Sequence, residues 1–156
     1  MAVRRLRLVP DPVLHEVCAP VSVFDAALAS LTRDMFETMY AATGRGLAAP
    51  QVGVTQRVFV MDALWKAETP TPMLFVNPEI TARSETRVVL DEGCLSLPDQ
   101  IVPFARPDAV DLRWQDLDGA WHAQQFTGFE AACVQHEIDH LDGILITEKP
   151  ACPDPM

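Results

Sequence analysis

Apolar side chains recur at helical spacing in the first third of the chain. Asp25 stands immediately before this stretch and has a side chain suited to capping a helix, so we expect a helix from Asp25 to about Ala42. One face of this helix carries Leu28, Leu31, Met35, Met39 and Ala42. A stripe of this kind is typical of a helix that packs on a core, and its methionines need no special role.

A second stretch at helical spacing lies near the end of the chain. Thr127 and Glu130 stand three residues apart, which is a capping-box pattern, and Gly143 is a plausible C-terminal stop. One side of the predicted helix carries Phe129, Ala132, Cys133, His136 and His140.

Short segments rich in β-branched and aromatic residues separate the two helices. The predicted strands are Arg57–Asp62, Met73–Val76, Thr86–Leu90, Ala109–Gln115 and Trp121–Phe126. Asp118 and Gly119 predict a hairpin turn between the last two. The order of helix, strands and helix favours an α+β fold with a mostly antiparallel sheet. At 156 residues we expect a single domain over 1–156, ending in an irregular, proline-rich tail at 149–156.

Composition narrows the class of protein. Apolar residues make up 49% of the chain, as in globular proteins, and 22 acidic against 12 basic residues give a net charge of −10. This charge argues against direct binding to nucleic acid or to an anionic membrane. The four cysteines show no C-x-x-C pair, and neither a secretory signal nor an apolar run of about 20 residues is present. We therefore expect a cytoplasmic protein with reduced thiols.

The second predicted helix contains the pattern H-E-x-x-H. His136 and His140 are four residues apart and so lie on one face of a helix, where both imidazoles can bind one metal ion. Glu137 beside them can transfer a proton. The other interpretation is a polar surface stripe, because so short a pattern also arises by chance.

A hydrolytic metal site usually has three protein ligands and a water molecule, so a third ligand is needed. The acids after the second histidine are Asp142, Glu148 and Asp154, and no further histidine follows. Cys94 is the better candidate, because the segment Asp91–Pro98 is expected to present it on an extended, irregular stretch. A thiolate ligand would favour a transition metal, whereas the alternative is a small buried hydrophobe.

Three segments together resemble one known family. Gly44–Gln51, Glu92–Pro98 and Gln135–Gly143 are similar, in order and spacing, to the three motifs of the peptide deformylases. The resemblance covers nearly the whole chain except about the last ten residues. It implies sheets wrapped around a central helix that carries H-E-x-x-H.

The resemblance implies a metal-dependent hydrolase that removes the N-formyl group from the N-terminal formylmethionine of nascent polypeptides and releases formate. It implies one divalent ion bound by Cys94, His136 and His140, with Fe(II) as the native metal, while Zn, Ni and Co also suit these ligands. Its partners would be N-formylmethionyl peptides and nascent chains in a bacterial cytoplasm, with a transient ribosome contact.

The resemblance also assigns roles within the reaction. Glu137 would carry the proton, and the side-chain amide of Gln51 and the backbone N–H of Leu95 would stabilise the oxyanion. Glu92 and Gln135 would support the site rather than react. The substrate-binding residues that it implies are Arg45, Gly46, Gly93 and Cys133. The first three would hold the peptide through their backbones, and the cysteine would line the methionine pocket unless it is plain core.

The chain departs from the family pattern around the predicted cleft. Arg45 occupies a position that usually holds Val or Ile, and Ile101 and Phe104 are apolar at or near positions where arginines often occur. These departures motivate a second hypothesis, a related amidohydrolase acting on another N-acyl or formyl substrate. A third is a non-catalytic protein that keeps the fold and binds nascent N-termini or the ribosome, and the intact Glu137 argues against it. A zinc endopeptidase is a fourth hypothesis, and it is weaker because this chain offers no candidate for the downstream third ligand that such enzymes usually have.

Overall fold

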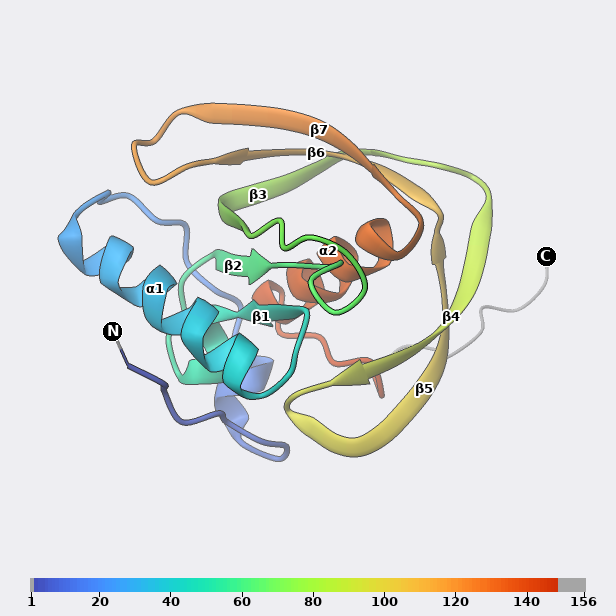
Figure 1. Ribbon diagram of the computed structural model, residues 1–156, viewed down its shortest axis with the longest axis horizontal. Helices are drawn as coiled ribbons and strands as arrows, with labels where there is room; N and C mark the ends of the chain where they lie inside the picture. The colour runs from blue at the N-terminus through green and yellow to red at the C-terminus, as the bar shows by residue number, and fades with distance from the viewer. Residues whose placement is uncertain (1, 149–156) are drawn as a thin grey trace.

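The computed structural model describes residues 2–148, which form two helices, two short 3-10 helices and seven strands (Figure 1). The helical elements are η1 (Pro12–His15), α1 (Ala26–Ala41), η2 (Ala49–Val52) and α2 (Gly128–Leu141). The strands are β1 (Gly46–Ala48), β2 (Val58–Met61), β3 (Met73–Arg83), β4 (Arg87–Cys94), β5 (Leu97–Pro107), β6 (Ala109–Gln115) and β7 (Trp121–Thr127). They form a five-stranded sheet in the order β1-β2-β3-β6-β7 and a separate β4–β5 hairpin. All these strand pairs are antiparallel, so the predicted α+β class is confirmed.

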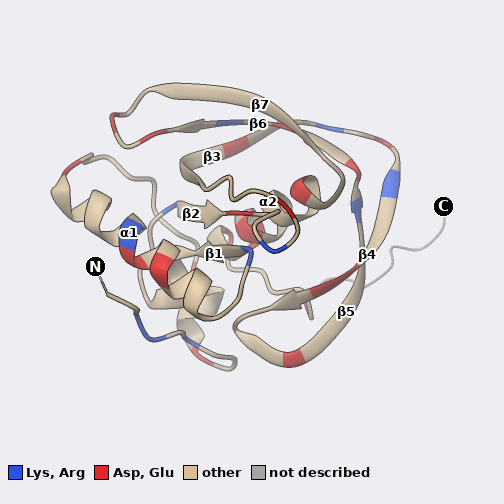
Figure 2. Cartoon of the chain, in the orientation of Figure 1, with Lys and Arg blue, Asp and Glu red and all other residues tan. Residues whose placement is uncertain are grey.

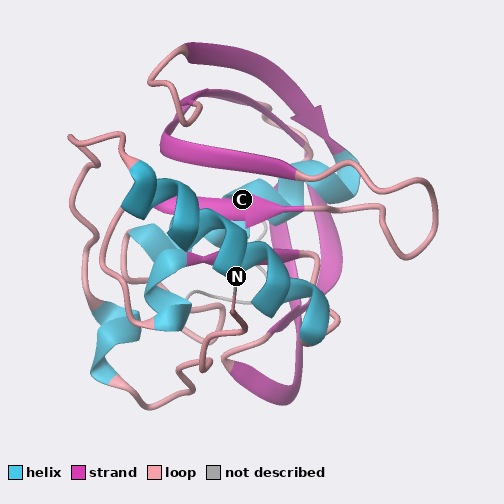
Figure 3. Cartoon of the chain, turned by 60° about the vertical axis from the view of Figure 1, so that its left-hand side comes forward, coloured by secondary structure: helices cyan, strands magenta, loops and turns pink. Residues whose placement is uncertain are grey.

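Strand β2 is buried on both faces and separates the two helices (Figures 1 and 3). Val58 and Val60 belong to the core cluster that contains the apolar face of α1. Phe59 and Met61 point the other way, into the cluster that contains the inner face of α2. Alternate side chains of a strand point to opposite faces, so this four-residue strand supports both cores.

Helix α1 follows its sequence prediction. The Asp25 side chain accepts a hydrogen bond from the backbone N–H of Leu28 at 3.0 Å, and the helix ends at Ala41. The predicted apolar residues Leu28, Leu31, Met35 and Met39 are all buried. Ala42 lies just outside the helix as its C-cap.

The strands agree less closely than α1 with the bounds predicted from the sequence. The segment Ala109–Gln115 is a strand with the predicted bounds, and Gly119 makes the hairpin turn after it at a φ of +83°. Strand β3 extends well beyond Val76, and β1 and β5 were not predicted. Cys94 is the last residue of β4, and the pairing of β4 with β5 shifts register between Gly93 and Cys94, so the segment is extended and locally irregular there as expected. Strand β5 was not predicted because its prolines argue against a strand. Both strands of a two-stranded sheet are edge strands, however, and proline is tolerated there.

Helix α2 begins and ends near the predicted residues. Thr127 is the N-cap residue, but its side chain makes no capping hydrogen bond, so the predicted capping box is wrong. The chain enters the helix through Gly128, whose φ is +60° and whose N–H donates to the carbonyl of Asp108 at 2.9 Å. Gly143, with a φ of +74°, ends the helix as predicted. The predicted tail at 149–156 lies outside the described residues.

Within residues 2–148, neither helix combines the length and apolar character that a membrane span requires.

Candidate metal centre

Cys94, His136 and His140 come together beneath the hairpin. The cysteine ends β4, and the two histidines lie one turn apart on the buried side of α2. One ligand atom from each residue lies within 4.8 Å of the others, and Sγ of Cys94 is 3.3 Å from Nε2 of His140. Side chains from distant parts of the chain therefore form a sulfur-and-nitrogen cluster.

This cluster fits a divalent transition metal. Zn–S and Zn–N bonds of about 2.3 and 2.1 Å in a tetrahedral site place ligand atoms roughly 3.5 Å apart. The separation between Cys94 and His140 agrees with that spacing. Beside the cluster, Oε1 of Glu137 is buried and has no hydrogen-bond partner within residues 2–148. A buried carboxylate oxygen without a partner is expected where a water or ligand belongs.

The downstream acids are engaged elsewhere. Glu148 accepts hydrogen bonds from the backbone N–H of Leu145 and pairs with Nε2 of His15, both at 2.8 Å. Asp142 forms an ion pair with Arg57 at 3.1 Å. Asp154 lies outside the described residues. Among the candidate third ligands within residues 2–148, Cys94 is the one that lies beside the histidines.

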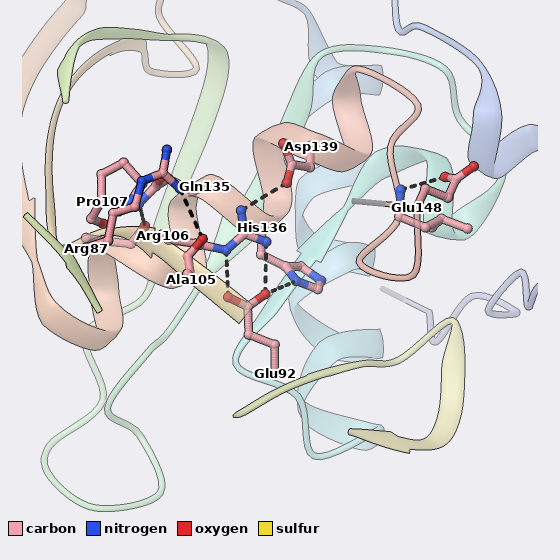
Figure 4. A network of polar contacts seen from close by, with 11 residues as sticks. Arg87, Glu92, Ala105, Arg106, Pro107, Gln135, His136, Asp139 and Glu148 are labelled. Carbon is pink, nitrogen blue, oxygen red and sulfur yellow. Dashed lines mark hydrogen bonds and ion pairs between the residues drawn. The ribbon is translucent and has the colours of Figure 1, made fainter. Parts of the chain in front are cut away.

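A buried ion-pair network orients one of the histidines (Figure 4). Oε1 of Glu92 lies 3.1 Å from Nδ1 of His136, which leaves Nε2 of that ring for a metal. Arg106 donates two hydrogen bonds to Glu92, at 2.6 and 2.9 Å, and a third to Asp139 at 3.0 Å. Burial alone would raise the pKa of Glu92, but hydrogen bonds from His136 and Arg106 outweigh it and lower this pKa. Glu92 thus stays ionised.

Arg106 is a site residue that the sequence motifs do not reveal. It lies on β5, is 3% exposed and belongs to none of the three motifs. Its importance depends on partners far away in the chain, so no local sequence signal identifies it.

Glu137 lies next to the cluster with its carboxylate facing β1. The side chain is 4% exposed, and burial raises its pKa to about 7. Its Oε2 atom lies beside Gly46, where an added Cβ atom would be only 2.5 Å away. A carboxyl group with a pKa near 7 can both accept and donate a proton at neutral pH.

Gln51 is held beside the predicted metal ligands by η2. Its side-chain oxygen accepts the backbone N–H of Ala48 at 3.0 Å. Its amide nitrogen donates to Oγ of Ser96 at 3.0 Å and lies 3.7 Å from Sγ of Cys94. Leu95 follows that cysteine in the sequence, and Gln51, Cys94 and Leu95 all line one cleft. Ser96, which is fully buried, was another residue that the motifs alone did not single out.

A cleft of about 610 Å³ opens above these residues. The predicted substrate-binding residues all line it, namely Arg45, Gly46, Gly93 and Cys133. Burial raises the pKa of the Cys133 thiol well above its ordinary value, so this thiol is neutral. Gln135 faces away and donates to the carbonyl of Pro107 at 3.0 Å.

The two apolar residues that depart from the family pattern, Ile101 and Phe104, lie in different places. Ile101 is 67% exposed on the rim of the cleft. Phe104 is 4% exposed, and the guanidinium carbon of Arg106 lies 4.2 Å from its ring centroid. Phe104 therefore packs on the ion-pair network, and its interpretation as a rim residue was wrong.

Comparison with known proteins agrees with this geometry. A family model described as polypeptide deformylase matches residues 3–153. The peptide deformylase of Zymomonas mobilis is 47% identical over 152 residues, which cover 95% of this chain and 86% of that protein. The crystal structure of peptide deformylase from Thermotoga maritima superposes with a TM-score of 0.90 at 39% identity, covering 96% of this chain and 98% of the other. A Met-Ala-Ser-bound class I type b peptide deformylase from Acinetobacter baumannii gives 0.89 at 33% identity, covering 96% and 99%. The chain belongs to the polypeptide deformylase family.

Proposed function

We propose that this protein is a metal-dependent peptide deformylase that hydrolyses the N-formyl group of N-terminal formylmethionine and releases formate. The observation that carries the proposal is the meeting of Cys94, His136 and His140 beside the buried carboxylate of Glu137. Membership of the family supplies the reaction class.

The protein groups suit amide hydrolysis. A divalent ion bound by the cysteine and two histidines supplies a Lewis acid that lowers the pKa of water and polarises a carbonyl. Glu137 takes the proton of the attacking water and returns it to the leaving amine, which its pKa of about 7 supports. The amide of Gln51 and the backbone N–H of Leu95 donate to the oxyanion that develops on the formyl oxygen.

We further propose Fe(II) as the native metal, with Zn, Ni and Co as substitutes. One thiolate and two imidazoles suit all of these ions, so the donor set alone does not separate them. Metal analysis of protein purified without oxygen tests this assignment. Iron at one equivalent per chain supports Fe(II), and zinc at one equivalent overturns it.

The substrates are N-formylmethionyl peptides and nascent chains, which places the activity in the cytoplasm. The Met-Ala-Ser complex of the Acinetobacter baumannii enzyme supports a methionyl peptide in the cleft. Backbone groups of Arg45, Gly46 and Gly93 would bind the peptide as an added strand. The neutral thiol of Cys133 would contact the methionine side chain.

The decisive experiment measures formate released from formyl-Met-Ala-Ser by Fe(II)-loaded protein under anaerobic conditions. Glu137→Gln, which keeps the size of the side chain, is measured alongside at equal metal content. We expect turnover by the native protein and a loss of roughly 10²- to 10⁴-fold in the variant. No formate from protein that holds one metal per chain would overturn the proposal.

Hydrolysis of another N-acyl group is the second candidate, because Arg45 and the exposed Ile101 alter the rim of the cleft. Formyl, acetyl and propionyl forms of Met-Ala-Ser separate the two. The deformylase proposal expects hydrolysis of the formyl form alone. Faster hydrolysis of a larger acyl group would favour the second candidate.

A further inference from the structure

One wall of the cleft carries two positive side chains. Arg45 precedes β1 and Lys66 lies in the loop after β2, and both line the cleft. Figure 2 shows basic residues beside β1 and in that loop, although the chain as a whole carries a net charge of −10. Both side chains are exposed, and within residues 2–148 neither forms an ion pair with a carboxylate.

Aromatic rings hold these two cations at the rim. The guanidinium carbon of Arg45 lies 5.2 Å from the ring centroid of Phe129, and the ammonium group of Lys66 lies 5.6 Å from that of Trp65. The indole N–H of Trp65 donates to the carbonyl of Gly44 at 2.8 Å. The loop that carries Lys66 is therefore anchored to the backbone next to Arg45, so both side chains start from neighbouring points on the same wall.

The two cations also affect one another. Burial, and then the charge of Arg45, lower the pKa of Lys66. A negative group between the two side chains would relieve this repulsion. The β4–β5 hairpin bears the opposite charge, since Asp91 and Asp99 line its side of the cleft. A ligand in the cleft thus passes between a basic wall and an acidic one.

We propose that Arg45 and Lys66 select formylmethionyl peptides that carry an acidic side chain at the second or third residue. The inference rests on the proposed deformylase function. Consecutive side chains of an extended peptide point to opposite sides, so one of these two positions faces the basic wall. Basic side chains at the same position are repelled by it.

The size of the effect follows from the exposure of both cations. Ion pairs with exposed side chains are weak, and two of them together correspond to a preference of roughly three- to tenfold. Salt screens such pairs, so the preference should shrink as ionic strength rises.

The test compares kcat/KM for formate release from six C-terminally amidated formyl tripeptides. Three place Glu, Gln or Lys after methionine, and three place the same residues at the third position. Amidation removes the terminal carboxylate, and the free-acid Gln peptides show whether that group is the one recognised. The proteins are the native chain, Arg45→Met, Lys66→Met, the double variant and Arg33→Met, which removes a positive charge from α1 outside the cleft.

We expect a Glu-to-Gln ratio of roughly three to ten at one position, a Lys-to-Gln ratio below one, and both ratios near one in the double variant. Arg33→Met should keep the native ratios. Each ratio is taken within one protein, so a general loss of activity in a variant cancels.

Two results would overturn the inference while leaving the deformylase function in place. One is equal hydrolysis of all six amidated peptides. This result counts even if the free-acid peptides are hydrolysed faster, because the terminal carboxylate would then be the group that is recognised. The other is an acidic preference that persists in the double variant. Failure to release formate from any peptide would instead overturn the proposed function itself.

Discussion

Gly46 packs directly against the carboxylate of Glu137. A side-chain carbon at Gly46 would lie 2.5 Å from Oε2 of Glu137 and 3.1 Å from Sγ of Cys133. The Glu137 side chain is enclosed on its other sides, being only 4% exposed. The missing side chain at Gly46 therefore determines where the proposed proton carrier can lie.

Gly46→Ala should displace this carboxylate without removing a metal ligand. Misplacement of a reacting group by about 1 Å can cost on the order of 100-fold in rate, so we expect kcat to fall by at least about tenfold. Steady-state kinetics and metal content are measured on the same sample. An unchanged kcat, with metal content and melting temperature near native values, would contradict this packing argument.

Arg106→Met should destabilise the fold strongly. The substitution leaves Glu92 as a buried charge without its main partner, a situation that typically costs about 3–5 kcal/mol. Urea unfolding of the metal-free protein measures the change. Arg113→Met is the matched control, because the Arg113–Glu79 pair is exposed and should contribute less than about 1 kcal/mol. Equal losses in the two variants would refute the structural role of the buried network.

Replacing the two cleft cysteines should separate metal binding from substrate binding. Cys94→Ala removes a proposed ligand, so one-to-one binding of Co(II) and the near-ultraviolet absorption of a Co(II)–thiolate bond should both be lost. Cys133→Ala should keep both, because Cys133 lies outside the three-residue cluster. Thiolate absorption that persists in Cys94→Ala would assign the sulfur ligand elsewhere.

Asp34 should make stability depend on pH. Its carboxylate accepts the backbone N–H of Ala2 at 2.8 Å and pairs with Arg4 at 2.9 Å, and these two hydrogen bonds lower its pKa. A carboxyl group with a lower pKa in the folded than in the unfolded state stabilises the fold above its unfolded pKa. This contribution disappears as pH falls through the folded value.

Asp34→Asn tests this dependence. The free energy of unfolding of the variant should fall below that of the native chain at pH 7, and the two curves should converge in acid. Urea titrations at a series of pH values measure the gap. A gap that stays constant down to low pH would show that ionisation of Asp34 contributes nothing.

The two helices could be predicted because their causes are local. Asp25 and the apolar stripe of α1 lie within one short segment, and the same holds for Gly143 at the end of α2. Strand β5 was missed because its partner β4 determines its structure, whereas its own prolines argue against a strand. The cap at the start of α2 was mispredicted, because Thr127 makes no side-chain cap and the N–H of Gly128 donates to the distant Asp108 carbonyl instead.

The residues of the site likewise divide into those with a local sequence signal and those without one. The motifs supplied the residues around the proposed metal, because H-E-x-x-H is a local pattern and Cys94 belongs to a recognisable segment. Arg106 and Trp65 belong to no pattern. Arg106 acts through long-range contacts to Glu92 and Asp139, and Trp65 through one to the Gly44 carbonyl. Only the folded chain brings these groups together.

The division of the proposed metal ligands between the hairpin and α2 has a mechanical consequence. Cys94 belongs to a hairpin that shares no strand pairing with the five-stranded sheet in residues 2–148, whereas both histidines belong to the central helix. An ion bound to all three would tie the two parts together as a covalent cross-link does, and its binding energy would add to the stability of the fold. Loss of that ion would therefore remove a cross-link at the cleft as well as the reactivity, and the contacts of Glu92 and Arg106 with α2 would be left to join the two parts.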